Sequence, residues 1–453
     1  MLSEHNPIAE LVHQIQQKWV DDVSPFSKLK LVRWLIKPDE ARLYEGFLRL
    51  ESTEHGSIPE MLIAMLTPFI SVAGYSKQII RDWVEAYKKD TKTQESLGSK
   101  NISFAWNPAF YLKEAEAEQN DCDDLLLKMI SDFQQSLPDK SMHLVLALFP
   151  HSIYDFEGFR YWLSNILKKG LPQDICFMIF DHIGENYYDK VFEKHPEVTK
   201  TLHVNLNMDD AIGKIAKMGD PNSPEVKFRE CILEMGKAAQ KNDQQRVDAW
   251  GEKALLATQQ SGLKSMFASA HLVYAGMLFT FKKFDKIDSL LARGLRIAQQ
   301  GLQLNDASCK PLVIQFYGYM AASKQLQKNT TEAITMYEKQ GDTAVSYQLP
   351  AMALTPYQQA YLLSGKKMTH LYDGLLKKAY NTGISLQKEE LTHSSFFTIG
   401  LDFYSWQKDH QQHDEAAETD EKLKEILGRD WKEKAKQTGA QYTLNAKEAA
   451  PAN

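Results

Sequence analysis

Three side chains stand where an α/β protein could carry out chemistry. His151 follows the apolar stretch 143–149, and Asp181 and His182 follow the apolar stretch 174–180. If both stretches are parallel strands, their carboxyl ends meet at one edge of a sheet, where ligands of α/β proteins usually bind. One interpretation is a ligand-binding or acid/base cluster of these three residues. The other, which we favour, is that Asp181 caps the next helix and that both histidines are half-exposed loop residues.

A phosphate-binding loop is missing from the chain. Such a loop has the pattern GxxxxGK[ST], in which backbone N–H groups hold the phosphates and the lysine reaches the terminal ones. The nearest match, Gly262-Leu-Lys264-Ser265, lies between two expected helices and lacks the first glycine. Gly98-Ser-Lys100 precedes the first expected strand, whereas a phosphate loop follows its strand. Neither segment therefore predicts a nucleotide site.

Other enzymatic motifs are absent as well. The stretch 143–149 is followed by Pro150 and His151, not by the acidic residues that would hold Mg²⁺. The patterns HExxH, GxSxG and GxGxxG do not occur, so zinc protease, hydrolase and dinucleotide chemistry gain no support. The sequence predicts a protein that is not an enzyme and that has no metal and no cofactor.

Composition and charge narrow the classes of partner. The formal net charge of −6 argues against a large phosphate-neutralising surface, so nucleic acid is not an expected partner. The N-terminus lacks the pattern of a signal peptide, and no apolar run approaches the ~20 residues that cross a bilayer. The 4 cysteines are scattered without a CxxC pair, which indicates free thiols in a reducing compartment. We therefore expect a cytoplasmic protein without a membrane segment.

The chain divides into regions of different predicted secondary structure, and one of them would contain the sheet edge. Residues 1–95 show helical spacing, and helices are expected near 8–15, 27–36, 39–50 and 78–89. Residues 96–222 alternate short apolar runs with helical patterns, and strands are expected at 102–106, 143–149, 174–180 and 201–206. Short strands that are apolar throughout and separated by helices predict a small parallel-sheet α/β domain.

From residue 223 onward the strand signals disappear and an internal repeat is found instead. Ala254, Gly294 and Ala379 each follow a basic residue and precede a glycine, and Ala333 marks a more diverged copy. The copies lie about 40 residues apart, a period typical of stacked helix pairs. We expect residues 223–435 to form about four helix pairs. The polar residues 436–453 are expected to be a disordered tail.

The best-defined copy resembles the tetratricopeptide repeat. Its matches fall at the pattern positions of the first helix, the turn and the second helix: Tyr274, Ala275, Phe284, Asp285, Ile287, Leu291 and Gly294. The proline that usually ends each unit is missing, and the period exceeds the standard ~34 residues. This length resembles the arrays attached to signalling ATPases. An α/β core followed by helical repeats likewise resembles the STAND-type signalling ATPases, here without the phosphate loop. An unrelated α/β fold with a parallel sheet is equally compatible with the expected strands.

The predicted fold class is mainly α with an α/β part: a helical N-terminal region, a small parallel-sheet domain and a tetratricopeptide-like α-solenoid. Stacked helix pairs expose a long surface, so the leading interpretation is an adaptor or scaffold that binds a partner protein or peptide. Four tyrosines are candidates for lining that groove, although their spacing also suits packing between repeats: Tyr317, Tyr319, Tyr337 and Tyr361. The alternatives are a divergent NTPase or nucleotide sensor and a structural subunit of a larger assembly.

Overall fold

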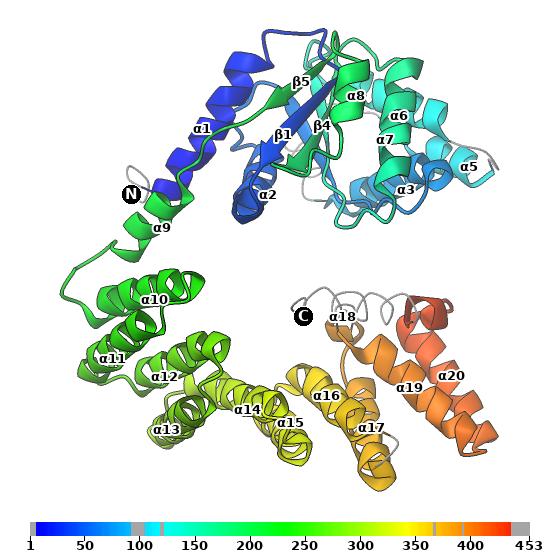
Figure 1. Cartoon of the computed structure of the whole chain (residues 1–453). Helices are drawn as coiled ribbons and strands as arrows, with labels where there is room; N and C mark the ends of the chain where they lie inside the picture. The colour runs from blue at the N-terminus through cyan, green and yellow to red at the C-terminus, as the bar shows by residue number, and fades with distance from the viewer. Residues whose placement is uncertain are drawn as a thin grey trace. The chain divides into compact units, whose positions relative to one another are not determined.

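Five parallel strands form the centre of the first part of the described chain. The computed structural model describes residues 6–91, 104, 106–117, 122–365, 368–391 and 394–435. These residues divide into two units between Ile215 and Ala216 (Figure 1). The first unit is an α/β fold and the second is an array of helices, so the chain is mainly α with an α/β part.

The elements of the first unit alternate along the chain. They are α1 (Pro7–Asp22), β1 (Leu31–Ile36), η1 (Pro38–Glu40), α2 (Ala41–Glu51), β2 (Met61–Met65), α3 (Val72–Lys89), α5 (Ala109–Ala117), α6 (Asp123–Ser136), β3 (Leu144–Leu148), α7 (Phe156–Lys169), β4 (Ile175–His182), α8 (Asp189–Lys194), β5 (Thr199–Leu202) and α9 (Met208–Ala216). The strand order is β2-β3-β4-β1-β5, and every neighbouring pair is parallel.

Both faces of the sheet are covered by helices, because successive side chains of each strand point to opposite sides. Val32, Trp34 and Ile36 of β1 pack in one cluster with residues of α1 and α2. Leu144, Leu146 and Leu148 of β3 belong to a second cluster with residues of α3, α6 and α7. A sheet buried on both faces has strands that are apolar throughout, which is the pattern that the sequence shows.

The expectation of a purely helical region over residues 1–95 is wrong in two places. The helix expected at 27–36 is instead strand β1, which pairs with β4 and β5, and residues 61–65 form β2 at the edge of the sheet. Residue 95 is therefore not a boundary between a helical region and the sheet. A short apolar run that is buried on both sides has no periodicity that separates a strand from a buried helix.

Of the four strands expected between residues 102 and 206, two are confirmed and a third is shifted. Strands at 143–149 and 174–180 are confirmed as β3 and β4. The strand expected at 201–206 begins earlier, as β5 at Thr199, and ends at Leu202. The strand expected at 102–106 lies largely outside the described residues, and the two of its residues that are described, Phe104 and Trp106, belong to no strand.

The second unit consists of helices that follow one another as antiparallel neighbours (Figure 1). They are α10 (Pro224–Gln240), α11 (Gln244–Gln260), α12 (Lys264–Leu278), η2 (Phe279–Phe281), α13 (Phe284–Gln303), α14 (Cys309–Leu326), α15 (Thr330–Ser346), η3 (Pro350–Ala353), α16 (Leu354–Ser364), α17 (Thr369–Ile384), α18 (Lys388–Leu391), α19 (Phe396–Asp409) and α20 (His413–Leu427). The tail expected at 436–453 lies outside the described residues.

In four successive helix pairs, a glycine on the second helix lies against an aromatic ring from the first helix of the following pair. A Cβ atom built at Gly251 of α11 would lie 2.5 Å from the ring of Tyr274, and one built at Gly294 of α13 would lie 2.3 Å from Phe316. The same relation joins Gly341 of α15 to Tyr357 and Gly383 of α17 to Phe396. Because these spaces are too small for any side chain, the recurring glycines bring neighbouring pairs into close contact.

This packing also corrects the alignment of the repeats. Ala254, Gly294, Ala333 and Ala379 all lie on the second helix of their pairs and all are buried. Only Gly294 among them receives a ring, and its structural equivalent in the preceding pair is Gly251, one helical turn before Ala254. The register expected from the sequence therefore holds at Gly294 only. The glycine that receives a ring lies about one turn before Ala254, about two turns after Ala333 (Gly341) and about one turn after Ala379 (Gly383).

Candidate functional site

The carboxyl ends of β1, β3 and β4 surround a pocket of about 240 Å³. Its walls are mostly apolar and include Ile36 of β1, Leu148 of β3 and Phe180 of β4. β1 leads to β2 at one end of the sheet, whereas its neighbour β4 leads to β5 at the other end. The edge between β1 and β4 is therefore a topological switch point, the usual ligand position in parallel α/β sheets.

Of the three residues predicted at this edge, Asp181 and His182 line the pocket and His151 does not. His151 is exposed, and its Nδ1 lies 2.8 Å from the carbonyl oxygen of Leu66. His182 is half-buried, and its Nδ1 has no hydrogen-bond partner among the described residues. His151 therefore behaves as an ordinary loop residue, and the three side chains do not act as one cluster.

Asp181 is a buried structural anion. It is 3% exposed, and its Oδ2 lies 3.1 Å from Nη1 of Arg33. Its two oxygens also accept the backbone N–H groups of His182, Tyr187 and Tyr188, at 3.0, 3.2 and 3.3 Å. These four bonds occupy about all the lone-pair positions of a carboxylate. Asp181 thus closes the turn between β4 and α8 and neutralises an arginine, which goes beyond the helix-capping role expected for it.

Arg33 is the partner that the sequence analysis missed. It lies inside β1 and is 6% exposed, and its guanidinium also bonds to Asp189 at 2.6 Å and to Thr201 at 3.1 Å. The same group lies over the ring of Phe192, 4.5 Å from its centroid. The available signal was a single arginine in an otherwise apolar run, because a buried charge requires a buried partner. This network ties β1 to β4, α8 and β5.

In the loop after β1, a carboxylate of the loop itself accepts a backbone N–H group. In nucleotide-binding α/β folds, phosphates bind free N–H groups at the start of the helix after the first strand. Here Pro38 has no N–H group, and the N–H of Lys37 donates to Oε2 of Glu40 at 2.9 Å. Glu40 is fully buried, and its Oε1 lies 3.6 Å from Nζ of Lys37. The backbone N–H of Lys37 is therefore already bonded to a side chain of the same loop and is not free for a phosphate.

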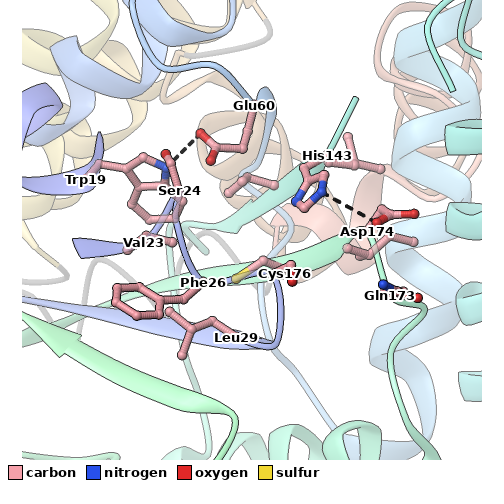
Figure 2. Close-up of a pocket in the computed structure, with 14 residues that line it drawn as sticks. Trp19, Val23, Ser24, Phe26, Leu29, Glu60, His143, Gln173, Asp174 and Cys176 are labelled. Atoms are coloured by element: carbon pink, nitrogen blue, oxygen red, sulfur yellow. Dashed lines mark hydrogen bonds and ion pairs between the residues drawn. The ribbon is translucent and has the colours of Figure 1, made fainter. Parts of the chain in front are cut away.

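A second pocket lies at the opposite, amino-terminal edge of the sheet (Figure 2). Trp19 donates from Nε1 to Glu60 at 2.9 Å, and Nε2 of His143 lies 3.5 Å from Asp174. Burial raises the pKa of the Cys176 thiol to about 12, so this cysteine is protonated and unreactive near neutral pH. The cavity measures about 20 Å³, which is room for about one water molecule and no larger ligand.

The helical unit carries a larger groove, of about 500 Å³, between α11 and α13 with α12 at its base. The wall from α11 is formed by one face of the helix, and so is the wall from α13. The lining residues are Glu252, Leu255, Leu256 and Gln259 of α11, Phe267 and His271 of α12, and Arg293, Arg296, Ile297 and Gln300 of α13. The close packing of Gly294 against Cβ of His271 sets the separation of α12 and α13 at this point.

The groove combines apolar surface with positive charge. Leu256 is 59% exposed, although it stands beside Leu255 and opposite Ile297. Arg293 and Arg296 are exposed and form no ion pair with any described residue. Glu252, the acidic residue of the lining, lies 3.6 Å from Nζ of Lys286, a lysine that it shares with Asp248. The pattern of two arginines three positions apart on one helix was visible in the sequence, but its surroundings were not.

His271 at the base of the groove adds no charge near neutral pH. The residue is 3% exposed, and its Nδ1 lies 2.9 Å from the carbonyl oxygen of Phe267. Burial is the main cause that lowers the pKa of His271, and the charge of Arg293 lowers it further. The positive charge of the groove lining therefore comes from the two arginines, which form no ion pair with the described residues.

The four tyrosines expected to line a groove do not meet at one surface. Tyr361 is fully buried, and its hydroxyl donates to Asp402 at 2.7 Å, so its assignment to an open groove is wrong. Tyr337 is half-buried and donates to Gln325 at 3.1 Å, and Tyr317 packs partly buried against the core of α10–α14. Tyr319 is 39% exposed, with its ring 5.9 Å from that of Phe279. None of the four lines the groove of α11–α13.

Comparisons with known proteins leave the site to be interpreted from its own geometry. The chain matches no protein-family model and no curated protein. Within the described part of the chain, no helix is both long enough and apolar enough to cross a membrane.

Proposed function

We propose that this chain is a non-catalytic adaptor or scaffold that binds a partner protein through its helical unit, which we interpret as a long-period tetratricopeptide-like array. The observation that carries the proposal is the groove of α11–α13, where apolar side chains are exposed together with two arginines that form no ion pair with the described residues. Exposed apolar surface next to fixed charge is typical of protein-binding sites. The array also supplies a rigid support, because each pair packs closely on the next.

A photo-crosslinking amino acid in place of Gln259 tests this proposal. Gln259 lines the groove, whereas Gln260 is exposed on the same helix and does not line it. The full-length chain with the crosslinker at either position is irradiated in an extract of its source cells. We expect a discrete protein adduct from position 259 and none from position 260. Equal labelling at both positions, or none at either, contradicts a partner-binding groove.

We interpret the α/β unit as an ATPase-like core that has lost its phosphate site, so nucleotide binding is not expected. The support for this is the buried carboxylate of Glu40 in the loop after β1, together with the occupied lone pairs of Asp181. Calorimetric titration of the full-length chain with Mg-ATP and with Mg-GTP is expected to show no heat of binding at millimolar nucleotide. A micromolar affinity for either nucleotide would favour the alternative of a divergent NTPase or nucleotide sensor.

A further inference from the structure

The walls of the α11–α13 groove have the same residue spacing. On α11 the lining residues fall at positions i, i+3, i+4 and i+7, from Glu252 to Gln259, and on α13 they fall at the same spacing, from Arg293 to Gln300. Each wall is therefore a helical ridge, and two ridges leave between them a channel that accepts the side chains of a third helix. This shape favours a helix over an extended strand, which would need unpaired backbone groups along an edge.

The charge of the channel is one-sided. Both arginines, Arg293 and Arg296, lie on the α13 wall, whereas the α11 wall contributes Leu255, Leu256 and a single carboxylate, that of Glu252. Glu252 lies 3.6 Å from Lys286, a lysine that is also 3.0 Å from Asp248, and no ion pair joins Glu252 to either arginine among the described residues. The lining therefore carries two positive charges against one negative charge. A guanidinium holds carboxylates through directed, paired hydrogen bonds, and two of them three positions apart match two acidic residues on one helical edge.

The channel also exposes apolar side chains on both of its walls. Leu256, which is 59% exposed, belongs to the α11 wall, Ile297 belongs to the α13 wall, and Phe267 is contributed by α12. Covering such side chains gains free energy in proportion to the apolar area removed from water. An occupant that satisfies both features has an apolar face and, along one side of it, a row of carboxylates.

We propose that the groove of α11–α13 binds an acidic amphipathic helix of a partner protein, with the apolar face of that helix on Leu256, Phe267 and Ile297 and its acidic edge on Arg293 and Arg296. This inference rests on the proposed function, because it specifies the partner of the same groove. The contact is electrostatically steered, so its affinity falls as ionic strength rises.

A random-peptide display library provides the probe. The full-length chain is the bait, and the enriched peptides are then measured by fluorescence anisotropy against three variants. Arg293→Glu with Arg296→Glu reverses the charge of the groove. Lys339→Glu with Lys422→Glu makes the same change in net charge at exposed positions outside the groove lining. Leu256→Ser removes the exposed apolar side chain.

We expect the enriched peptides to be acidic, with Asp or Glu at i and i+3 or i+4 beside a helical row of apolar residues. The arginine reversal and Leu256→Ser should each weaken binding at least about tenfold, which corresponds to about 1.4 kcal/mol, whereas the lysine reversal should leave the affinity within about twofold. Circular dichroism checks that all variants remain helical.

The inference is overturned if the enriched peptides are neutral or basic, if they bind the arginine variant as well as the parent, or if no peptide is enriched. A crosslinked partner at position 259 together with any of these results would leave the proposed function standing and reject only the acidic helix. The absence of both a crosslinked partner and enriched peptides would reject the two proposals together.

Discussion

Asp181→Ala is expected to destabilise the protein by about 3–5 kcal/mol. The substitution leaves the buried guanidinium of Arg33 with one carboxylate, that of Asp189, whose side chain is 42% exposed, and with the hydroxyl of Thr201. It also leaves three backbone N–H groups of the β4–α8 turn without their acceptor. Removing one member of a buried ion pair costs more than the pair itself contributes, because the other charge stays buried without compensation. Urea unfolding of the full-length chain, followed by tryptophan fluorescence, measures the change.

Two further variants separate the buried pair from ordinary surface effects. Asp189→Ala removes the more exposed carboxylate of the same arginine and is expected to cost about 1 kcal/mol or less. His151→Ala, in an exposed loop, is expected to be nearly neutral. If Asp181→Ala were as mild as His151→Ala, Asp181 would not have the structural role that we assign to it.

Gly294→Leu should destabilise the helical unit by about 1–3 kcal/mol or more, because the space for a side chain is already filled. A Cβ atom at this position would lie 2.3 Å from Phe316 of the next pair and 2.8 Å from Cβ of His271 in its own pair. Both neighbours are buried, so neither moves aside without disturbing the core. The midpoint of urea unfolding, followed by far-ultraviolet circular dichroism, reports the loss.

The matched control is Gly374→Leu. Gly374 lies in α17 of the same unit, is exposed, and has no atom within 4 Å of a built Cβ. Replacing a glycine in an exposed helix interior gains about 0.5–1 kcal/mol from helix propensity, so this variant should be neutral or slightly more stable. Equal stability of the two leucine variants would refute close packing at Gly294. The shape of the α11–α13 groove should change together with that packing, because Gly294 lies behind its wall.

Local patterns were sufficient for the strands β3 and β4 and for most helices. Each of these is a run whose periodicity or length is visible without knowing its neighbours, as for the apolar residues of β3. The same reasoning failed for β1, because a strand buried on both faces lacks alternation and its one charged residue interrupts the apolar run. Arg33 is stabilised by Asp181, which lies 148 positions further along the chain. A pairing over such a distance leaves no trace in the local sequence.

By itself, the sequence determined that this protein combines a parallel-sheet part with a helical repeat, because the spacing of apolar residues indicates both. It also determined that the chain lacks the pattern of a phosphate loop, because that pattern is a short motif. The tertiary structure alone decided that the buried carboxylate of Glu40 accepts the N–H of Lys37 in the loop after β1 and that Asp181 pairs with Arg33. It also decided that Leu256, Phe267 and Arg293 line one groove. These relations depend on which elements pack together, since a contact between distant residues is fixed by the burial of whole helix and strand faces and not by the type of any single residue.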